Sequence, residues 1–445
     1  MVAAQVFTTA TKQKRPHIVY ILADDLGWND VGFHGSNAIQ TPNIDALAYS
    51  GIILQNFYVN PLCTPSRAAL MTGKYPIRTG MQHFVLYGAE PRGLPLKEKL
   101  LPEYLKELGY TNHMVGKWHL GHYKKKYTPL YRGFHSHLGF WTGRQDFYDH
   151  TACENGTWGL DMRRGMDVAY DLHGEYSTDV FTRKATSLIR DHDPSKPLFL
   201  YMSHAAMHSG NTYILISYAF LVALYKLDQS VGLLVEALSE RKMLEDTIII
   251  FTTDNGGPAA GFNINAASNW PLKGVKSTLW EGGVRGAALV WSTAFKNPGR
   301  VSTQLMDITY WLPTLLSAAS NKSIDTRRQA MVVCSDRKDS KSCDPFHGPC
   351  LFNIEDDPCE TNNVAKEHPE VLKDLQSRLN EISKTAEPPG NLPLYERGNP
   401  EHWSYVWTNF GDHLNLPDDI KPKGEPLLPI TEAVFACTKN GGKLF

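Results

Sequence analysis

Short apolar segments recur through the first 320 residues of the chain, and each is followed at once by polar residues. Most of them are rich in Ile, Val, Leu, Phe and Tyr, without alternation of apolar and polar positions. Continuous runs of this kind predict strands that are covered on both faces of a sheet. The predicted strands are residues 17–23, 110–115, 197–202 and 247–253.

Helical patterns lie between these strands. Residues 41–48 and 101–108 each carry a proline near the start, and the second is closed by Gly109, as helices often are. Residues 221–238 have apolar side chains at helical spacing. Because strands alternate with helices, we expect an α/β fold, with a mostly parallel sheet flanked by helices. The apolar run 213–225 is too short to span a bilayer, so we expect a buried helix or strand and no transmembrane segment.

The composition of the chain changes near residue 320. Beyond it, charged, Pro-rich and Cys-rich segments dominate, and one helix is predicted over residues 369–385. A length of 445 residues suits two domains. We therefore expect a large domain over residues 15–320 and a small, Cys-rich C-terminal domain over residues 321–445, truncated and partly irregular.

Polar residues follow all four predicted strands. In parallel sheets, ligands collect at the carboxyl ends of the strands, so these residues predict one shared site. They are Asp24, Asp25, Lys117, His119, His204, His208, Asp254 and Asn255.

Four of these residues carry the oxygen atoms that a hard divalent cation prefers: Asp24, Asp25, Asp254 and Asn255. Without a metal, three carboxylates at one point would repel one another and be partly protonated. A helix cap or a solvated turn also explains either acidic pair taken alone. Two such pairs after two buried strands favour a metal site.

Cys63 precedes Thr64-Pro65-Ser66-Arg67 and an Ala- and Leu-rich stretch that predicts a helix. Residue 63 would then lie at a helix N-terminus, where anions are stabilised. A low-pKa thiol or a half-cystine is the alternative interpretation of this residue.

Arg67, Lys117 and Lys276 are cations that could hold an anion, and His119 and His208 are candidate proton carriers. Any one of them alone is more often a surface cation or a hydrogen-bonded histidine. Lys117 and His119 are two positions apart, and on an extended segment they point to the same side.

The composition excludes some classes of protein and favours others. With 42% hydrophobic residues, 20% charged residues and a net charge of −1, the chain has no global basic field for nucleic acid. Six cysteines remain besides Cys63, an even number that suits disulfides. Zinc is the alternative for the four within residues 334–359, although no CxxC pair is present.

Signals for cellular location disagree. The sequons at Asn155 and Asn321 predict a glycoprotein of the secretory route. Residues 1–15 lack the apolar core of a signal peptide.

Longer motifs resemble the type I, formylglycine-dependent sulfatases, and most of all the arylsulfatase B group. Residues 63–73 have the form C-x-P-S-R…L-x-T-G, by which such sulfatases have one cysteine oxidised to an aldehyde. The other matching stretches are residues 21–28, 116–121, 253–257, 269–276, 279–286 and 349–358.

The resemblance implies an alkaline-phosphatase-like fold with a small C-terminal antiparallel sheet. It implies that a formylglycine-generating enzyme converts Cys63 to formylglycine. It also implies one Ca²⁺ per chain, held by Asp24, Asp25, residue 63, Asp254 and Asn255. The sulfate pocket would consist of Arg67, Lys117, His119, His208 and Lys276.

The implied reaction is hydrolysis of a sulfate ester. A hydroxyl of hydrated formylglycine attacks sulfur, His208 with Lys276 protonates the departing alcohol, and His119 then helps to expel sulfate. Expected substrates are aryl sulfates or sulfated carbohydrates, typically the N-acetylgalactosamine 4-sulfate of glycosaminoglycans. The expected location is the lysosome or the cell exterior.

The chain departs from the family pattern near residues 209–224, which are short and apolar, and near 318–334, where most of the link between domains is missing. One alternative is therefore a catalytically inactive, sulfatase-like glycan-binding protein. A second is a phosphoesterase of the same superfold. Such enzymes use Ser or Thr as nucleophile, often with zinc, and the Cys63 motif argues against this alternative.

Overall fold

The computed structural model describes residues 15–210, 216–259, 261, 265–320, 343–344, 347–418 and 420. The predictions for the N-terminal leader, for the sequon at Asn321 and for Cys334 and Cys437 lie outside the described residues.

A ten-stranded sheet forms the centre of the molecule, in the order β13-β2-β12-β11-β1-β10-β4-β5-β8-β9. The five strands β11, β1, β10, β4 and β5 run parallel, and antiparallel pairs appear only toward the edges, at β12 and β8. The predicted α/β fold is therefore confirmed. The strands are β1 His17–Ala23, β2 Ile52–Leu54, β4 Thr111–Lys117, β5 Ser136–Phe140, β8 Arg163–Arg164, β9 Asp167–Val168, β10 Leu198–Ser203, β11 Thr247–Thr253, β12 Ala288–Trp291 and β13 Arg300–Ser302.

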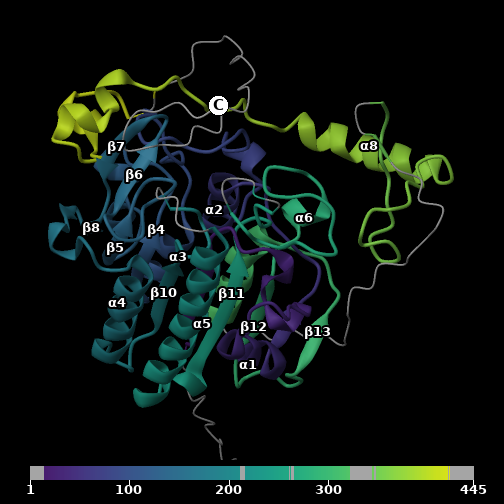
Figure 1. Cartoon of the computed structure of the whole chain (residues 1–445), viewed down its shortest axis with the longest axis horizontal. Coiled ribbons are helices and arrows are strands. Elements are labelled where there is room, and N and C mark those ends of the chain that lie inside the picture. The colour runs from purple at the N-terminus through teal and green to yellow at the C-terminus, as the bar shows by residue number, and fades with distance from the viewer. Residues whose placement is uncertain are drawn as a thin grey trace, which may run out of the picture.

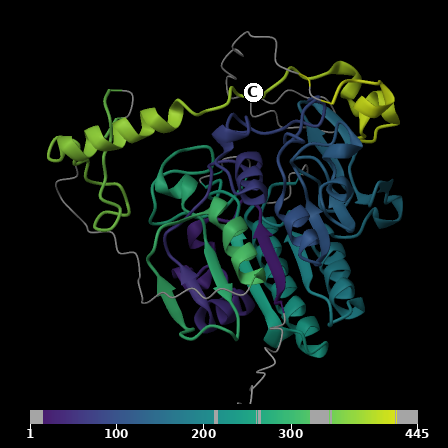
Figure 2. The same cartoon turned by 180° about the vertical axis from the view of Figure 1, so that it is seen from behind.

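Helices cover both faces of the sheet (Figures 1 and 2). Val19 and Ile21 of β1 pack into one core with α1, α4 and α5, whereas Ile18 and Tyr20 pack into a second core with α2, α3 and α7. Because successive strand residues enter opposite cores, both sets are apolar and the sequence shows no alternation. The helices are α1 Pro42–Ser50, α2 Cys63–Thr72, α3 Leu101–Glu107, α4 Ser177–Asp191, α5 Ile216–Glu240, α6 Glu281–Val284, α7 Trp311–Ala319, α8 Pro369–Ser383 and α9 Phe410–His413.

Two small sheets and several 3-10 helices complete the described fold. β3 Phe57–Tyr58 pairs with β14 Met306–Asp307, and β6 Thr151–Glu154 pairs with β7 Thr157–Leu160. The β6–β7 turn leaves the sequon residue Asn155 exposed. The 3-10 helices are η1 Trp28–Asp30, η2 Gly32–His34, η3 Pro76–Arg78, η4 Lys125–Tyr127, η5 Pro129–Tyr131, η6 Tyr170–Leu172, η7 Leu244–Asp246, η9 Ile308–Tyr310, η10 Glu396–Gly398 and η11 Pro400–Trp403.

The five predicted helices are confirmed as α1, α2, α3, α5 and α8. The part of the apolar run 213–225 from residue 216 onward belongs to α5, whose Ala223 and Leu224 are buried against the sheet. Within the described part of the chain, every helix is too short or too polar to cross a membrane.

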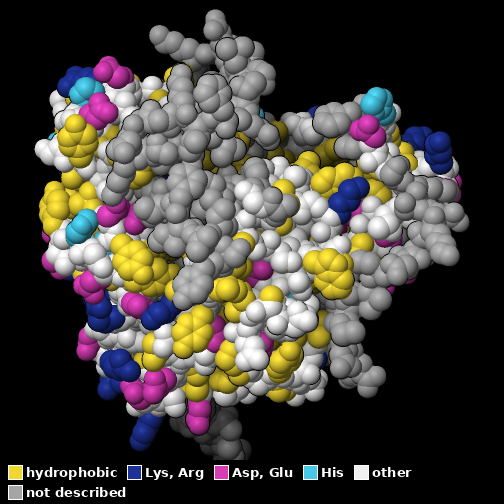
Figure 3. Space-filling model, viewed as in Figure 1, with side chains coloured by type: hydrophobic (Ala, Val, Ile, Leu, Met, Phe, Trp, Pro, Cys, Tyr) yellow, Lys and Arg dark blue, Asp and Glu magenta, His cyan; other side chains and the backbone are white. Residues whose placement is uncertain are grey.

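The last described part of the chain packs along residues 15–320. Residues 387–418 make this contact, with backbone hydrogen bonds from Tyr395 to Ala89 and from Trp407 to Leu160. Helix α8 instead stands away from the main body (Figures 1 and 2). On the face shown in Figure 3, basic and acidic side chains are interspersed.

Cysteines of the described region are mostly oxidised. Cys343 and Cys350 form a disulfide, and Cys153 and Cys359 are also disulfide-bonded. Cys63 is the free cysteine of the described residues, and it is buried.

Candidate active site

The carboxyl ends of the central strands and the N-terminus of α2 meet at one buried point. Asp24 and Asp25 follow β1, Asp254 follows β11, and Cys63 is the first residue of α2. One ligand atom from each of these four residues lies within 4.8 Å of the others. The three carboxylates are fully buried and Cys63 is almost so. The three carboxylates lie where strands β1 and β11 end, as expected for polar residues that follow parallel strands, whereas Cys63 reaches this point from the start of a helix.

Three buried cations neutralise the three carboxylates. Lys117 Nζ lies 2.7 Å from Asp24 Oδ2, and Lys276 Nζ lies 2.6 Å from Asp25 Oδ1. Asp254 Oδ2 accepts from Arg67, at 3.1 Å from Nε and 2.7 Å from Nη2. Buried charges are tolerated when they are paired in this way. We call these six side chains the charged cluster.

Burial and neighbouring charges act in opposite directions on the pKa values of Asp25 and Asp254. Burial tends to raise the pKa of Asp25, but Lys276 and His208 outweigh it and the pKa is lowered. For Asp254, burial and the repulsion from Asp24 prevail over Arg67, so its pKa is raised. A divalent cation would relieve that repulsion.

Asn255 offers a free oxygen beside the carboxylates. Its Nδ2 donates to Asp25 Oδ1 at 2.8 Å, whereas its buried Oδ1 has no hydrogen-bond partner. An unsatisfied buried acceptor is costly, and a cation would satisfy it. With Asp24, Asp25 and Asp254, this atom completes a set of oxygen ligands that fits a hard divalent cation such as Ca²⁺.

The surroundings of Cys63 do not favour a thiolate. Burial raises the pKa of the thiol to about 12, although Lys117 and Lys276 act to lower it. Its Sγ lies 3.7 Å from Asp24 Oδ1. The two alternatives from sequence, a low-pKa thiol and a half-cystine, are therefore both opposed by the structure.

His119 lies buried beside the cluster with one nitrogen engaged. Its Nε2 is 3.0 Å from the Leu86 carbonyl oxygen, to which it donates, and its buried Nδ1 has no partner. Burial, then Lys117 and Arg67, hold the pKa of His119 well below its usual value. The neutral ring therefore presents an acceptor at Nδ1.

The prediction for the backbone around His119 was wrong. The residue has φ of 57°, so the segment after β4 is not extended. Earlier in the same segment, Gly116 lets β4 pass close to β10, because a Cβ at residue 116 would lie 1.8 Å from the Ser203 carbonyl oxygen. Lys117 reaches the cluster from the last position of β4.

The structure places His208, rather than His204, against the carboxylates. His208 Nε2 lies 3.6 Å from Asp25 Oδ2, and Nδ1 lies 3.0 Å from the Ser209 carbonyl oxygen. His204 is buried on another side, where Nε2 is 3.0 Å from Ser230 Oγ of α5.

Two residues near the cluster escaped the sequence analysis. Ser203 Oγ accepts a hydrogen bond from Arg67 Nη1 at 2.6 Å. Because Ser203 is the last residue of β10, it could have been predicted as a site residue like the other polar residues at strand ends. Glu154 is a buried carboxylate at the end of β6. The Asn155-Gly156 pair after it predicts a hairpin, but the local sequence does not show which distant loops that hairpin packs against.

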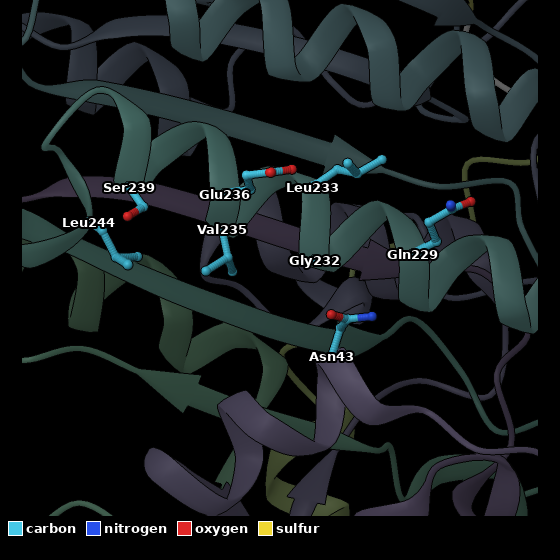
Figure 4. Close-up of a pocket in the computed structure, with 8 residues that line it drawn as sticks. All are labelled: Asn43, Gln229, Gly232, Leu233, Val235, Glu236, Ser239 and Leu244. Atoms are coloured by element: carbon cyan, nitrogen blue, oxygen red, sulfur yellow. The ribbon is translucent and has the colours of Figure 1, made fainter.

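A separate hollow lies between α1 and α5 (Figure 4). It has a volume of about 530 Å³ and shares no residue with the charged cluster. Its lining residues are Asn43, Gln229, Gly232, Leu233, Val235, Glu236, Ser239 and Leu244.

Comparison with known proteins assigns this arrangement to a family. Residues 16–321 match the Sulfatase family model, so the chain belongs to the sulfatase family. It is 43% identical over 330 residues to arylsulfatase J of Mus musculus, covering 71% of this chain and 54% of that protein. It is 35% identical over 338 residues to N-acetylgalactosamine-6-sulfatase of Homo sapiens, covering 70% and 64%.

The fold agrees with that assignment. The crystal structure of Ps i-CgsB in complex with k-i-k-neocarrahexaose matches with a TM-score of 0.72 and 26% identity, over 85% of this chain and 95% of that one. The chain spans between about half and two thirds of the length of the two curated relatives above.

Proposed function

We propose that this protein hydrolyses sulfate esters, with formylglycine made from Cys63 as nucleophile and a bound Ca²⁺. The observation that carries the proposal is the position of Cys63: a buried helix N-terminus among three carboxylates and three cations, in a member of the sulfatase family. Residue 63 and the other proposed site residues lie within the matched region.

The ion would be held by Asp24, Asp25, Asp254 and Asn255, together with modified residue 63. All four unmodified ligands offer oxygen, which favours Ca²⁺ over the softer zinc. When bound, the ion supplies Lewis-acid polarisation of a sulfate oxygen. It would also relieve Lys117 and Lys276 of part of their pairing with Asp24 and Asp25, so that both ammonium groups could bind the substrate.

The aldehyde proposed at residue 63, once hydrated, supplies a hard hydroxyl nucleophile where a thiol would be a soft one. The N-terminal amides of α2 favour negative charge at that point. His119 Nδ1 is buried without a partner, so it could accept a hydrogen bond from a hydroxyl of residue 63. It would take the proton of that hydroxyl when sulfate is expelled.

The remaining side chains would bind and orient the substrate. Lys117 and Lys276 would hold sulfate oxygens, and Arg67 would keep Asp254 in place through its paired contacts. His208 would protonate the departing alcohol, helped by Lys276. Burial lowers the pKa of His208 in the free protein, and a bound sulfate would shift it upward.

The substrate class we propose is sulfated carbohydrate, in particular the N-acetylgalactosamine 4-sulfate of glycosaminoglycans, with aryl sulfates as surrogates. It rests on the family resemblance and on relatives named arylsulfatase J and N-acetylgalactosamine-6-sulfatase. The same resemblance supports a formylglycine-generating enzyme as partner, a lysosomal or secreted location, and a catalytic domain over residues 15–320 with a small C-terminal domain over 321–445.

A paired assay tests the reaction class. Purified protein is given a nitrophenyl sulfate and the matching nitrophenyl phosphate, with Ca²⁺ present. We expect sulfate release at least about a hundredfold faster than phosphate release. Faster phosphate release would indicate a phosphoesterase, and release of neither by fully modified protein would indicate a binding protein.

A further inference from the structure

Glu154 is a buried carboxylate outside the charged cluster. It ends β6, and 7% of it is exposed. Neither of the candidate metal-binding groups includes it. Its burial therefore needs another explanation, because a buried carboxylate is retained only where it is well hydrogen-bonded or paired.

The carboxylate of Glu154 joins two loops that are far apart in sequence. Its Oε2 accepts the backbone N–H of Gly88, and its Oε1 accepts the backbone N–H of Gly143 at 2.7 Å. Burial raises the pKa of Glu154 to about 7, against the lowering effect of these two hydrogen bonds, and the bonds are strongest when the carboxylate is charged. Glu154 thus fixes the 86–88 loop and the 141–143 loop relative to each other.

Both loops hold the ring of His119. The 86–88 loop supplies the Leu86 carbonyl, which accepts from Nε2 at 3.0 Å. The 141–143 loop packs so closely that a Cβ at Gly143 would lie 2.6 Å from Nε2 and 3.3 Å from Glu154 Oε1. Rotation of the ring is therefore blocked as long as the two loops stay in place.

The orientation of the ring decides which nitrogen can act on the substrate. While Nε2–H donates to Leu86, Nδ1 is left as the acceptor. The same loop reaches the residue next to the nucleophile, because the N–H of Leu86 donates to Thr64 Oγ1 at 3.1 Å. Movement of the 86–88 loop would disturb both the hydrogen bond that fixes the tautomer of His119 and the contact with Thr64, the residue after the proposed nucleophile.

We propose that Glu154 is a positioning residue of the active site, which holds the two loops that fix the His119 ring with Nδ1 as its free acceptor. The inference rests on the proposed function. Glu154 touches neither substrate nor ion in this role, and it acts through His119.

The test is a graded series at position 154. Glutamine keeps the shape of the side chain but has only one acceptor oxygen. In E154Q an NH₂ group would therefore face one of the two backbone N–H groups, of Gly88 or of Gly143, and that hydrogen bond would be lost. Aspartate keeps the charge on a shorter side chain. We expect kcat for an aryl sulfate to be highest in wild type, lower in E154D and lowest in E154Q. The kcat of E154Q should lie about tenfold to a hundredfold below that of wild type, and its KM should change less than about threefold.

Asp228 provides the matched control. It is also buried and accepts backbone N–H groups, from Asn43 at 3.0 Å and Ile44 at 2.9 Å, but it caps α1 rather than a loop beside His119. We expect D228N to lower the melting temperature and leave kcat unchanged. If E154Q and D228N lowered kcat by the same factor, Glu154 would have only a general structural role.

A double-mutant cycle with His119→Ala adds a readout specific to the mechanism. If Glu154 acts through His119, E154Q lowers the residual rate of H119A less than about twofold. Unchanged kcat in E154Q would overturn the inference, as would unfolding of both variants at position 154. An inactive wild type would instead contradict the proposed function.

Discussion

The charged cluster is buried and helix α8 exposes leucine side chains, which is the opposite of what charged and apolar residues usually do. Asp24, Asp25, Asp254 and Arg67 are fully buried, whereas no residue of α8 is buried. Leu375 and Leu379 of α8 are 54% and 62% exposed. The cluster is tolerable because each charge has a partner. The proposed chemistry therefore depends on residues that the central strands hold in place. Helix α8 contributes little to the stability of the fold, because none of its residues is buried.

The largest expected effect comes from removing the proposed nucleophile. Cys63→Ala should lower the rate of aryl sulfate hydrolysis by roughly a thousandfold or more. Circular dichroism and thermal melting should show that the fold is retained, because alanine is compatible with a helix start and leaves the ion pairs intact. Substantial turnover in this variant would exclude residue 63 as the nucleophile.

Removal of the ion should have the next largest effect. Treatment with a chelator should reduce activity by about a hundredfold or more, and added Ca²⁺ should restore it. Zinc should restore less, since all unmodified ligands offer oxygen. Isothermal titration with Ca²⁺ measures binding without reference to turnover. Activity that survives exhaustive chelation would oppose the metal site.

A pair of leucine substitutions tests the comparison with α8 directly. Leu227 of α5 is fully buried in the core beneath the sheet, so Leu227→Ala should lower the free energy of unfolding by about 3 kcal/mol. Leu379→Ala in α8 should change it by less than about 0.5 kcal/mol. Urea unfolding followed by tryptophan fluorescence gives both values. Equal losses would show that α8 is packed in solution.

The smallest expected effect concerns the contact between the large domain and residues 387–418. His122 is buried between the rings of Trp141 and Trp407, and burial lowers its pKa to about 3. In the unfolded chain the pKa is about 6.5. Its neutral form therefore supports folding above pH 6.5, and this support is lost as the pH falls, because the unfolded chain takes up the proton.

His122→Phe should remove that dependence. Between pH 7.5 and pH 5, wild type should lose about 2 kcal/mol more stability than the variant. Urea unfolding at both pH values measures the difference. An identical loss in the two proteins would mean that His122 is accessible to protons in the folded state.

The sequence was most informative where chemistry follows directly on a buried strand. Asp24, Asp25, Asp254 and Asn255 could be grouped because parallel strands end at one edge. The helix start at Cys63 was likewise readable from Pro65 and the apolar residues that follow.

Features that depend on contacts distant in sequence could not be read in this way. The positive φ of His119 and the close approach of β4 to β10 at Gly116 could not be read from the residue types. Asn155-Gly156 predicts the β6–β7 hairpin, but the contact of Glu154 with Gly88, 66 residues earlier, could not be read from it. His204 contacts Ser230 of α5 and His208 lies near Asp25, a difference that depends on how the chain folds after β10.

Mass spectrometry of the peptide that contains residue 63 tests the central claim most directly. The protein is produced in a host that has a formylglycine-generating enzyme, and the peptide is isolated after digestion. The account predicts the mass of the aldehyde in place of the thiol, in proportion to sulfate-releasing activity. An unmodified Cys63 in protein that still hydrolyses sulfate esters would contradict it.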